Sequence, residues 1–359
     1  MNPAAERIVQ FRSDGLGLSP AAYARLLAEI AESRGIAEDD YSRDGVVAEL
    51  EGRMAALLGK EAAVFMPSGT LANHLALRLL TRNGRRVLVQ RESHLYNDEG
   101  DCAQQLSGLT LVPLAPGRAS FTFDEAAAEI AGPPDARVAI PVGAISIETP
   151  VRRMSGEAFD VAEMRRIAEF ARERGIGLHL DGARLLIETV YTGIAPAEYS
   201  ALFDTVYVSL YKYLNAAAGA ILAGPADLLD GLYHQRRMFG GGLPHVWPYA
   251  AVALHYFDGF TERFAAAAAV FDQLLDALRD HPRVTIARPP NATNVAVLIV
   301  SGGDAGALPK RLLGDGIAIR PARRIWAGGA EFALHANETI LRRPLAETIR
   351  GFVAALDVA

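Results

Sequence analysis

Lys212 is the residue whose surroundings most suggest chemistry. It lies in the segment Ser209-Leu210-Tyr211-Lys212-Tyr213-Leu214, after an apolar run that predicts a strand and before a run of small residues. A lysine amine can attack an aldehyde once it has lost its proton, and an apolar setting lowers the pKa of such an amine. The segment alone is equally typical of an exposed loop lysine. We therefore treat Lys212 as a candidate for binding an aldehyde cofactor.

Asp181 strengthens this interpretation. It ends a predicted buried strand in the segment His179-Leu180-Asp181-Gly182-Ala183-Arg184, upstream of Lys212. Ligands of open α/β sheets bind beyond the carboxyl ends of the strands. A buried carboxylate there can pair with a protonated pyridine nitrogen, which keeps the ring an electron sink. Alone, Asp181 would be interpreted as a helix cap; together with Lys212 the functional interpretation is favoured.

A phosphate cradle is predicted at Ser68, Gly69 and Thr70, between a predicted strand and a predicted helix. Amide groups at a helix N-terminus, two hydroxyls and a glycine suit a phosphate group. The alternative is ordinary capping of the helix by Ser68 or Thr70. The signal is weak by itself.

Two histidines have different interpretations. His94 follows the predicted strand Arg86–Gln90 and could stack on a flat cofactor ring, with Glu99 close behind it in the chain. A single loop histidine is nevertheless more often structural. His179 is interpreted as structural, because it belongs to the strand that carries Asp181.

Strands and helices alternate through most of the chain, which predicts an α/β fold with a mostly parallel sheet covered by helices. We expect a large domain over residues 1–248, including an N-terminal arm, and a small C-terminal α+β domain over 249–359 that begins with a long helical stretch, Tyr249–Arg279. The predicted strands of the large domain are Ala62–Met66, Arg86–Gln90, Leu109–Leu114, Val138–Ile147, Gly177–Leu180, Thr205–Ser209 and Ala218–Ala223.

Composition excludes several classes of protein. The 359 residues carry a net charge of -6 with no basic stripe, which argues against a nucleic-acid partner. No apolar stretch is long enough to span a membrane, and no secretory signal is recognised. The single cysteine, Cys102, fits a reducing cytoplasm, and no Cys/His cluster predicts a metal site. The composition therefore predicts a cytoplasmic enzyme.

The combination of segments resembles the threonine aldolase and β-eliminating lyase family of fold type I pyridoxal-phosphate-dependent enzymes. The resemblance runs in the family's order from Ser13 to about Pro248 and is weaker in the C-terminal domain. The matching segments are Phe11-Arg12-Ser13-Asp14, Leu58-Gly59-Lys60-Glu61-Ala62, Pro67-Ser68-Gly69-Thr70, His94 with Glu99, Leu180-Asp181-Gly182-Ala183-Arg184, Ser209 with Lys212, Met238 followed by Gly240-Gly241-Gly242, and Thr293-Asn294-Val295.

The resemblance implies a role for each matching residue. Lys212 would hold pyridoxal 5'-phosphate as a Schiff base, Asp181 would pair with its pyridine nitrogen, and His94 would stack on its ring. The remaining implied contacts are Ser68, Gly69 and Thr70 with the phosphate, Ser209 and Arg184 with the cofactor, and Ser13 and Arg184 with the carboxylate of an amino-acid substrate. The family also implies a homodimer or homotetramer with active sites at the subunit interface.

Two positions depart from the family's pattern. Threonine aldolases carry Glu-Asn-Thr-His where this chain has Glu148-Thr149-Pro150-Val151, and valine can neither accept nor relay a proton. Glu331 takes the place of an arginine that binds the substrate carboxylate, and a glutamate would repel that group. We expect Arg320, Arg323 or Arg324 to replace the missing contact, or the substrate to be unusual.

The leading functional prediction is a carbon–carbon lyase that cleaves a β-hydroxy-α-amino acid to glycine and an aldehyde. The alternative is β-elimination, racemisation or amino transfer on a related amino acid. Val151 favours this alternative because it removes the histidine beside the substrate hydroxyl. Under the alternative, Val151 would line a pocket for an apolar or non-hydroxylated side chain. A catalytically idle binding protein is disfavoured by the presence of both Lys212 and Asp181. A dehydrogenase is disfavoured because no Gly-x-Gly-x-x-Gly segment follows a first strand.

Overall fold

The computed structural model describes residues 7–81, 84–133, 135 and 137–358. The chain forms two compact units, Pro20–Phe257 and a smaller one that combines Met1–Ser19 with Asp258–Ala359. The unit boundary therefore follows Phe257 rather than residue 248. The N-terminal arm, which we expected in the large domain, contributes β1 (Val9–Gln10) to the smaller unit, where it pairs in parallel with β11 (Ile317–Ala318).

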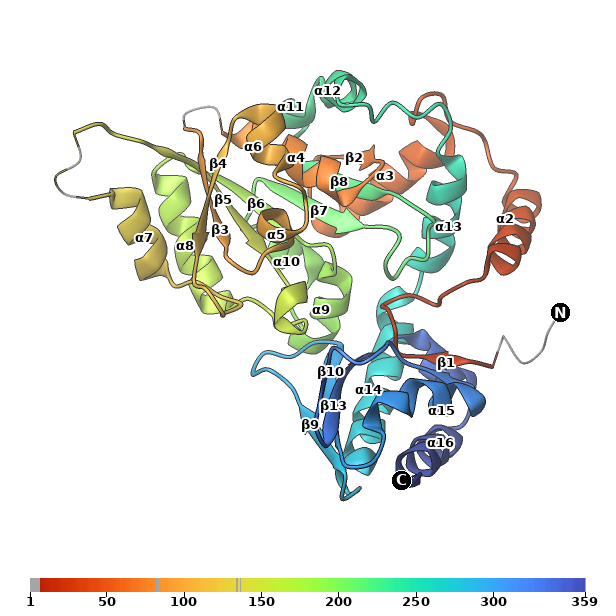
Figure 1. Ribbon diagram of the computed structural model, residues 1–359. Coiled ribbons are helices and arrows are strands. Elements are labelled where there is room, and N and C mark those ends of the chain that lie inside the picture. Colours follow the sequence, from red (N-terminus) through yellow and green to blue (C-terminus); the bar gives the residue numbers. More distant parts are fainter. Residues whose placement is uncertain (1–6, 82–83, 134, 136, 359) are drawn as a thin grey trace. The chain divides into compact units, whose positions relative to one another are not determined.

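A seven-stranded sheet forms the centre of the larger unit (Figure 1). Strand β8 is antiparallel to both of its neighbours, whereas the other neighbouring strands are parallel. All strands except β8 thus end at the same edge, which confirms the expected mostly parallel sheet. The spatial order is β2 (Ala62–Met66), β8 (Ala220–Gly224), β7 (Thr205–Ser209), β6 (Gly177–Asp181), β5 (Val142–Glu148), β3 (Arg86–Gln90) and β4 (Thr110–Leu114).

Helices cover both faces of this sheet, as expected (Figure 1). Helix α4 (Gly69–Leu80) packs an apolar side that includes Leu75 against Met66 and Leu222. Alternate strand residues point to the opposite face, where Val208 and Ile221 are also fully buried. The other helices of the unit are α2 (Pro20–Arg34), α3 (Gly45–Leu58), α5 (His94–Asn97), α6 (Cys102–Ser107), α7 (Phe123–Ala131), α8 (Val161–Glu173), α9 (Leu185–Thr192), α10 (Pro196–Ser200), α11 (Ala226–Leu229), α12 (Leu232–Met238) and α13 (Trp247–Phe257).

The smaller unit is an α+β structure, as expected. Its antiparallel sheet has the order β12 (Arg324–Trp326), β13 (Gly329–His335), β10 (Val295–Ser301) and β9 (Val284–Ala287), and its helices are α14 (Phe260–Arg279), α15 (Leu308–Gly314) and α16 (Leu345–Asp357). Phe11 of the arm packs in its core against Phe271 and Phe352. The single helical stretch expected over Tyr249–Arg279 is wrong, because α13 and α14 are separate helices and Gly259 adopts a φ of 65° between them.

No helix in the described ranges is long and apolar enough to cross a membrane.

Candidate active site

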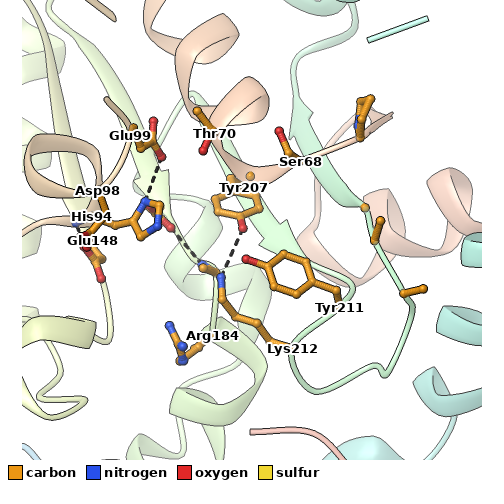
Figure 2. A pocket seen from close by; sticks show the side chains of 17 residues that line it. Ser68, Thr70, His94, Asp98, Glu99, Glu148, Arg184, Tyr207, Tyr211 and Lys212 are labelled. Atoms are coloured by element: carbon orange, nitrogen blue, oxygen red, sulfur yellow. Dashed lines mark hydrogen bonds and ion pairs between the residues drawn. The ribbon is translucent and has the colours of Figure 1, made fainter. Parts of the chain in front are cut away.

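A pocket of about 340 Å³ opens at the carboxyl edge of the large sheet (Figure 2). The residues that line it all belong to the larger unit. They come from segments far apart in the chain, which the parallel strands bring to one edge. The lining includes most of the predicted site residues, namely Ser68, Gly69, Thr70, His94, Asp181, Arg184 and Lys212.

The predicted phosphate cradle is the start of α4. Ser68 caps this helix, and its Oγ accepts a hydrogen bond from Leu71 N at 3.2 Å. The first amide groups of a helix have no partner inside it, and they favour an anion. Position 69 must be glycine, because a Cβ there would lie 2.1 Å from the Tyr207 hydroxyl oxygen. The close approach of α4 to β7 therefore shapes the cradle.

Lys212 lies between two tyrosines just beyond β7 (Figure 2). Its Nζ donates to the Tyr207 hydroxyl at 3.4 Å and lies 5.0 Å from the centre of the Tyr211 ring. Burial, with smaller contributions from the charges of Asp181 and Tyr211, raises the pKa of Tyr207 well above its ordinary value. The Tyr207 phenol is therefore neutral beside the lysine amine.

Ser209 points to the same face of β7 as Tyr207, because strand side chains alternate. It is buried and does not line the pocket. A hydrogen bond between the side chains of Ser209 and Tyr207 lowers the pKa of Tyr207, against the larger effect of burial. Ser209 thus contacts the tyrosine that lies against the phosphate cradle, and its predicted contact with the cofactor stays a prediction.

Asp181 ends β6 and is buried. Its Oδ2 accepts a hydrogen bond from Asn73 Nδ2 at 2.8 Å, and its Oδ1 accepts one from Ala183 N at 3.2 Å. The carboxylate is thus held by donors from α4 and from its own turn while it faces the pocket. This arrangement suits a fixed negative charge opposite a protonated ring nitrogen.

His94 begins α5 and forms part of the pocket wall (Figure 2). Its Nδ1 lies 3.1 Å from Glu99 Oε1, and this hydrogen bond is the main cause of a raised His94 pKa. Its backbone N donates to Glu148 Oε2 at 2.5 Å. Hydrogen bonds therefore hold both the ring and the backbone of His94. A residue that packs on a cofactor ring needs such a fixed position.

Glu148 also lines the pocket, and it was not among the site residues predicted from the sequence. It is buried at the end of β5, in register with Asp181 on β6. Its Oε1 accepts from Arg152 N at 2.9 Å, and burial, reinforced by the charge of Asp181, raises its pKa to about 7. Its place at the end of a predicted strand, like that of Asp181, was the signal that could have identified it.

Asp98 and Tyr211 are further pocket residues that sequence reasoning missed. Asp98 Oδ1 pairs with Arg153 at 3.0 Å, and its Oδ2 lies 3.7 Å from Arg152. Asp98 follows His94 by one helical turn, and this spacing predicts that the two side chains share one face of a helix. Helix α5 is too short for its sequence to show a helical pattern, so this signal was missed.

Val151 lies next to the pocket in sequence but does not line it. Its side chain is fully buried, and among the described residues it is Glu148, not Val151, that lines the pocket. After β5, Val151 N donates to Glu157 O at 2.8 Å. The pocket-lining role that the alternative reaction would give Val151 is therefore not observed.

Ser13 and Glu331 belong to the smaller unit. Ser13 Oγ accepts from Gln10 Nε2 at 3.3 Å. Glu331 Oε2 forms an ion pair at 3.0 Å with Arg324, which lies opposite it in the sheet. The negative charge of Glu331 is thus balanced locally. The carboxylate-binding roles of Ser13, Arg320 and Arg323 stay predictions.

Comparisons with known proteins agree with this geometry. Residues 10–301 match the β-eliminating lyase family. The chain is 31% identical over 244 residues to a low-specificity L-threonine aldolase of Candida albicans (67% of this chain, 64% of that protein). It is 30% identical over 253 residues to an alanine racemase of Cochliobolus carbonum (70% and 63%). These matches span a little less than two thirds of each curated relative.

Two crystal structures resemble the whole chain. One is of a protein from Exiguobacterium sp. 255-15 assigned as an aromatic amino acid β-eliminating lyase or threonine aldolase; it is 27% identical, with a TM-score of 0.84 and coverage of 99% of this chain and 98% of that one. The other is of a protein from Listeria monocytogenes assigned as an L-allo-threonine aldolase, which is 27% identical with a TM-score of 0.80 and the same coverage.

Proposed function

We propose a carbon–carbon lyase activity for this chain, which belongs to the β-eliminating lyase family. The proposed reaction is the retro-aldol cleavage of a β-hydroxy-α-amino acid to glycine and an aldehyde. The observation that carries the proposal is the grouping of Lys212, Asp181 and His94 around one pocket beside a phosphate cradle. The similarity to proteins named or assigned as threonine aldolases supports this reaction.

Pyridoxal phosphate is the cofactor, as the sequence predicted. When bound, it supplies an electron sink for the electrons released by bond cleavage at the substrate Cα. We propose that Lys212 attaches it, Asp181 faces its ring nitrogen and His94 packs on its ring. Ser68, Gly69, Thr70 and Ser209 would hold the phosphate, and Arg184 would contact the cofactor or the substrate carboxylate.

Glu148 is the group that we propose as base for the substrate hydroxyl. It lines the pocket and has a pKa of about 7, which suits a base that works near neutral pH. His94 has a raised pKa and a hydrogen bond to Glu99, so it suits the role of a cation or donor better. A base at Glu148 removes the need for a histidine at position 151.

Release of aldehyde tests the proposed reaction. The wild-type protein should release aldehyde and glycine from at least one of L-threonine, L-allo-threonine and L-phenylserine, and Lys212→Ala should release neither. Product analysis with other amino acids is run in parallel. Keto acid or racemised product without any aldehyde would establish the alternative, namely β-elimination, racemisation or amino transfer.

We propose from the family that the chain forms a homodimer or a homotetramer. Its active sites would lie at the subunit interface. Exposed apolar side chains at the pocket residue Tyr211 and at Met238 support a contact with a second copy. Light scattering of the purified protein would test this assembly by measuring its mass in solution.

The cytoplasm is the location that we propose, and the single cysteine supports it. Fractionation of cells that express the chain would test this location.

A further inference from the structure

Asn73 connects the groups on two sides of the pocket. It lies on α4, one turn after the phosphate cradle, and is fully buried. Its Nδ2 donates to Asp181 Oδ2 and to Glu99 Oε1, both at 2.8 Å. One amide thus gives its two N–H groups to two different carboxylates. Glu99 in turn holds His94.

The two carboxylates fix the orientation of this amide, because a flipped amide would place its oxygen against two acceptors. The Asn73 oxygen therefore faces His179, whose Nε2 lies 3.0 Å from Asn73 Oδ1 and whose Nδ1 lies 2.8 Å from Thr205 Oγ1. The imidazole is fully buried, and burial lowers its pKa to about 4, so it is neutral at physiological pH. A neutral ring facing this oxygen carries its proton on Nε2 and donates it to Asn73.

The two carboxylates need such a donor between them. Burial and the nearby Asp181 charge raise the pKa of Glu99, whereas the hydrogen bonds from His94 and Asn73 lower it. A carboxylate buried near another negative charge tends to take up a proton. The donor from Asn73 opposes this at Glu99, because it favours the ionised form of that acid.

We propose that Asn73 is a positioning residue for the cofactor, holding Asp181 against the ring nitrogen and, through Glu99, His94 on the ring face. This inference rests on the cofactor site of the proposed function. It gives His179, interpreted from sequence as structural, an indirect part in the site, because His179 bonds the oxygen of the Asn73 amide.

An analogue without the ring nitrogen separates positioning from folding. The apoprotein is titrated with pyridoxal phosphate and with its 1-deaza analogue, in which carbon replaces that nitrogen. Wild type should bind pyridoxal phosphate more tightly, because Asp181 can pair with it. Asn73→Ala should weaken pyridoxal phosphate about 10- to 100-fold, the typical effect of one hydrogen bond to a buried charge, and leave the analogue little changed. The ratio of the two affinities should therefore fall towards one.

His74→Gln is the matched control. His74 is the next residue of the same helix, is buried, and its Nε2 lies 2.7 Å from Ser107 Oγ rather than from either carboxylate. This variant should keep the wild-type ratio. Should Asn73→Ala fail to fold, Asn73→Leu keeps a branched side chain of similar size without a hydrogen-bond donor or a new charge, so the same fall in the ratio is expected.

The effect of Asn73 on Glu99 is measured separately, through the titration of His94. Without the donor from Asn73, Glu99 takes up a proton more easily, and the NMR titration of His94, identified by its loss in His94→Gln, should move to lower pH. An unchanged affinity ratio in a folded Asn73 variant overturns the proposal, as does an equal loss for both cofactors. Neither readout uses an amino acid, so a failed aldehyde assay leaves this inference standing, and failure of this inference leaves the reaction standing.

Discussion

At the scale of single residues, Glu148 has two properties of a catalytic base. It lines the pocket, and burial raises its pKa to about 7. If it is the base, kcat/KM should rise as pH increases through about 7, because the ionised form is the active one. Glu148→Gln should lower kcat/KM by about 100-fold or more and remove this rise. The measurement is the pH profile of aldehyde release.

Glu157→Gln is the control for that profile. The pKa of Glu157 is also raised by burial, but its side chain does not line the pocket. Its variant should keep both the rate and the rise near pH 7. A Glu148→Gln enzyme with the wild-type profile would assign the base to another group.

At the scale of secondary-structure elements, the contact between α4 and β7 controls the phosphate cradle. Gly69→Ala would place a methyl group 2.1 Å from the Tyr207 hydroxyl and 2.5 Å from the ring carbon that carries it. The helix start must then shift. We expect the affinity of the apoprotein for pyridoxal phosphate to fall by at least about tenfold, equivalent to one lost hydrogen bond to a charged group, as measured by titration.

Gly52→Ala is the matched control on α3. A Cβ at Gly52 meets no heavy atom within 4 Å, so alanine should leave cofactor affinity unchanged and stabilise the helix by roughly 0.5–1 kcal/mol. Gly69→Ala with wild-type affinity would show that the cradle does not depend on this close approach.

The sequence contained enough information to predict the strand ends and the residues directly after them. Lys212, Asp181 and Ser68 follow buried apolar runs, so local patterns identified them. The contacts of Asn73 with Asp181 and of Tyr207 with Gly69 join segments far apart in the chain, and no local pattern reports them.

Each incorrect prediction has its own cause. A single glycine inside a helical pattern is usually tolerated, which is why the break at Gly259 was missed. Val151 was given a pocket-lining role under the alternative reaction because it stands where the family carries a histidine, but its side chain is fully buried and does not line the pocket. The arm was assigned to the wrong unit because its pairing partner, β11, is distant in sequence.

At the scale of the whole molecule, buried carboxyl groups should make stability depend on pH. Burial raises the pKa of Glu188 from 4.5 to about 7, and Glu148 has a similar value. Between pH 4.5 and about pH 7 these groups therefore bind more protons in the folded chain than in the unfolded chain. Stability should therefore fall as pH rises from about 4.5 to about 7, by on the order of 1 kcal/mol per pH unit for each group.

Glu188→Gln tests this dependence away from the pocket. Glu188 accepts a hydrogen bond from Thr149 Oγ1 at 2.7 Å, which a glutamine oxygen can also accept. Urea unfolding of the apoprotein at several pH values should show a smaller decline in the variant than in wild type. Glu49→Gln, at an exposed side chain, should follow wild type. Equal declines in all three proteins would contradict the burial argument.

The pairing of β1 with β11 has a consequence for how the protein is made. The larger unit, Pro20–Phe257, is continuous in the chain, whereas the smaller one draws on segments before and after it. Domains that are continuous can fold while the ribosome is still adding residues. The arm must wait through the synthesis of the entire larger unit before Ile317 and Phe352 exist to receive Val9 and Phe11. During that interval Val9 and Phe11, both fully buried in the folded protein, lack the core that covers them.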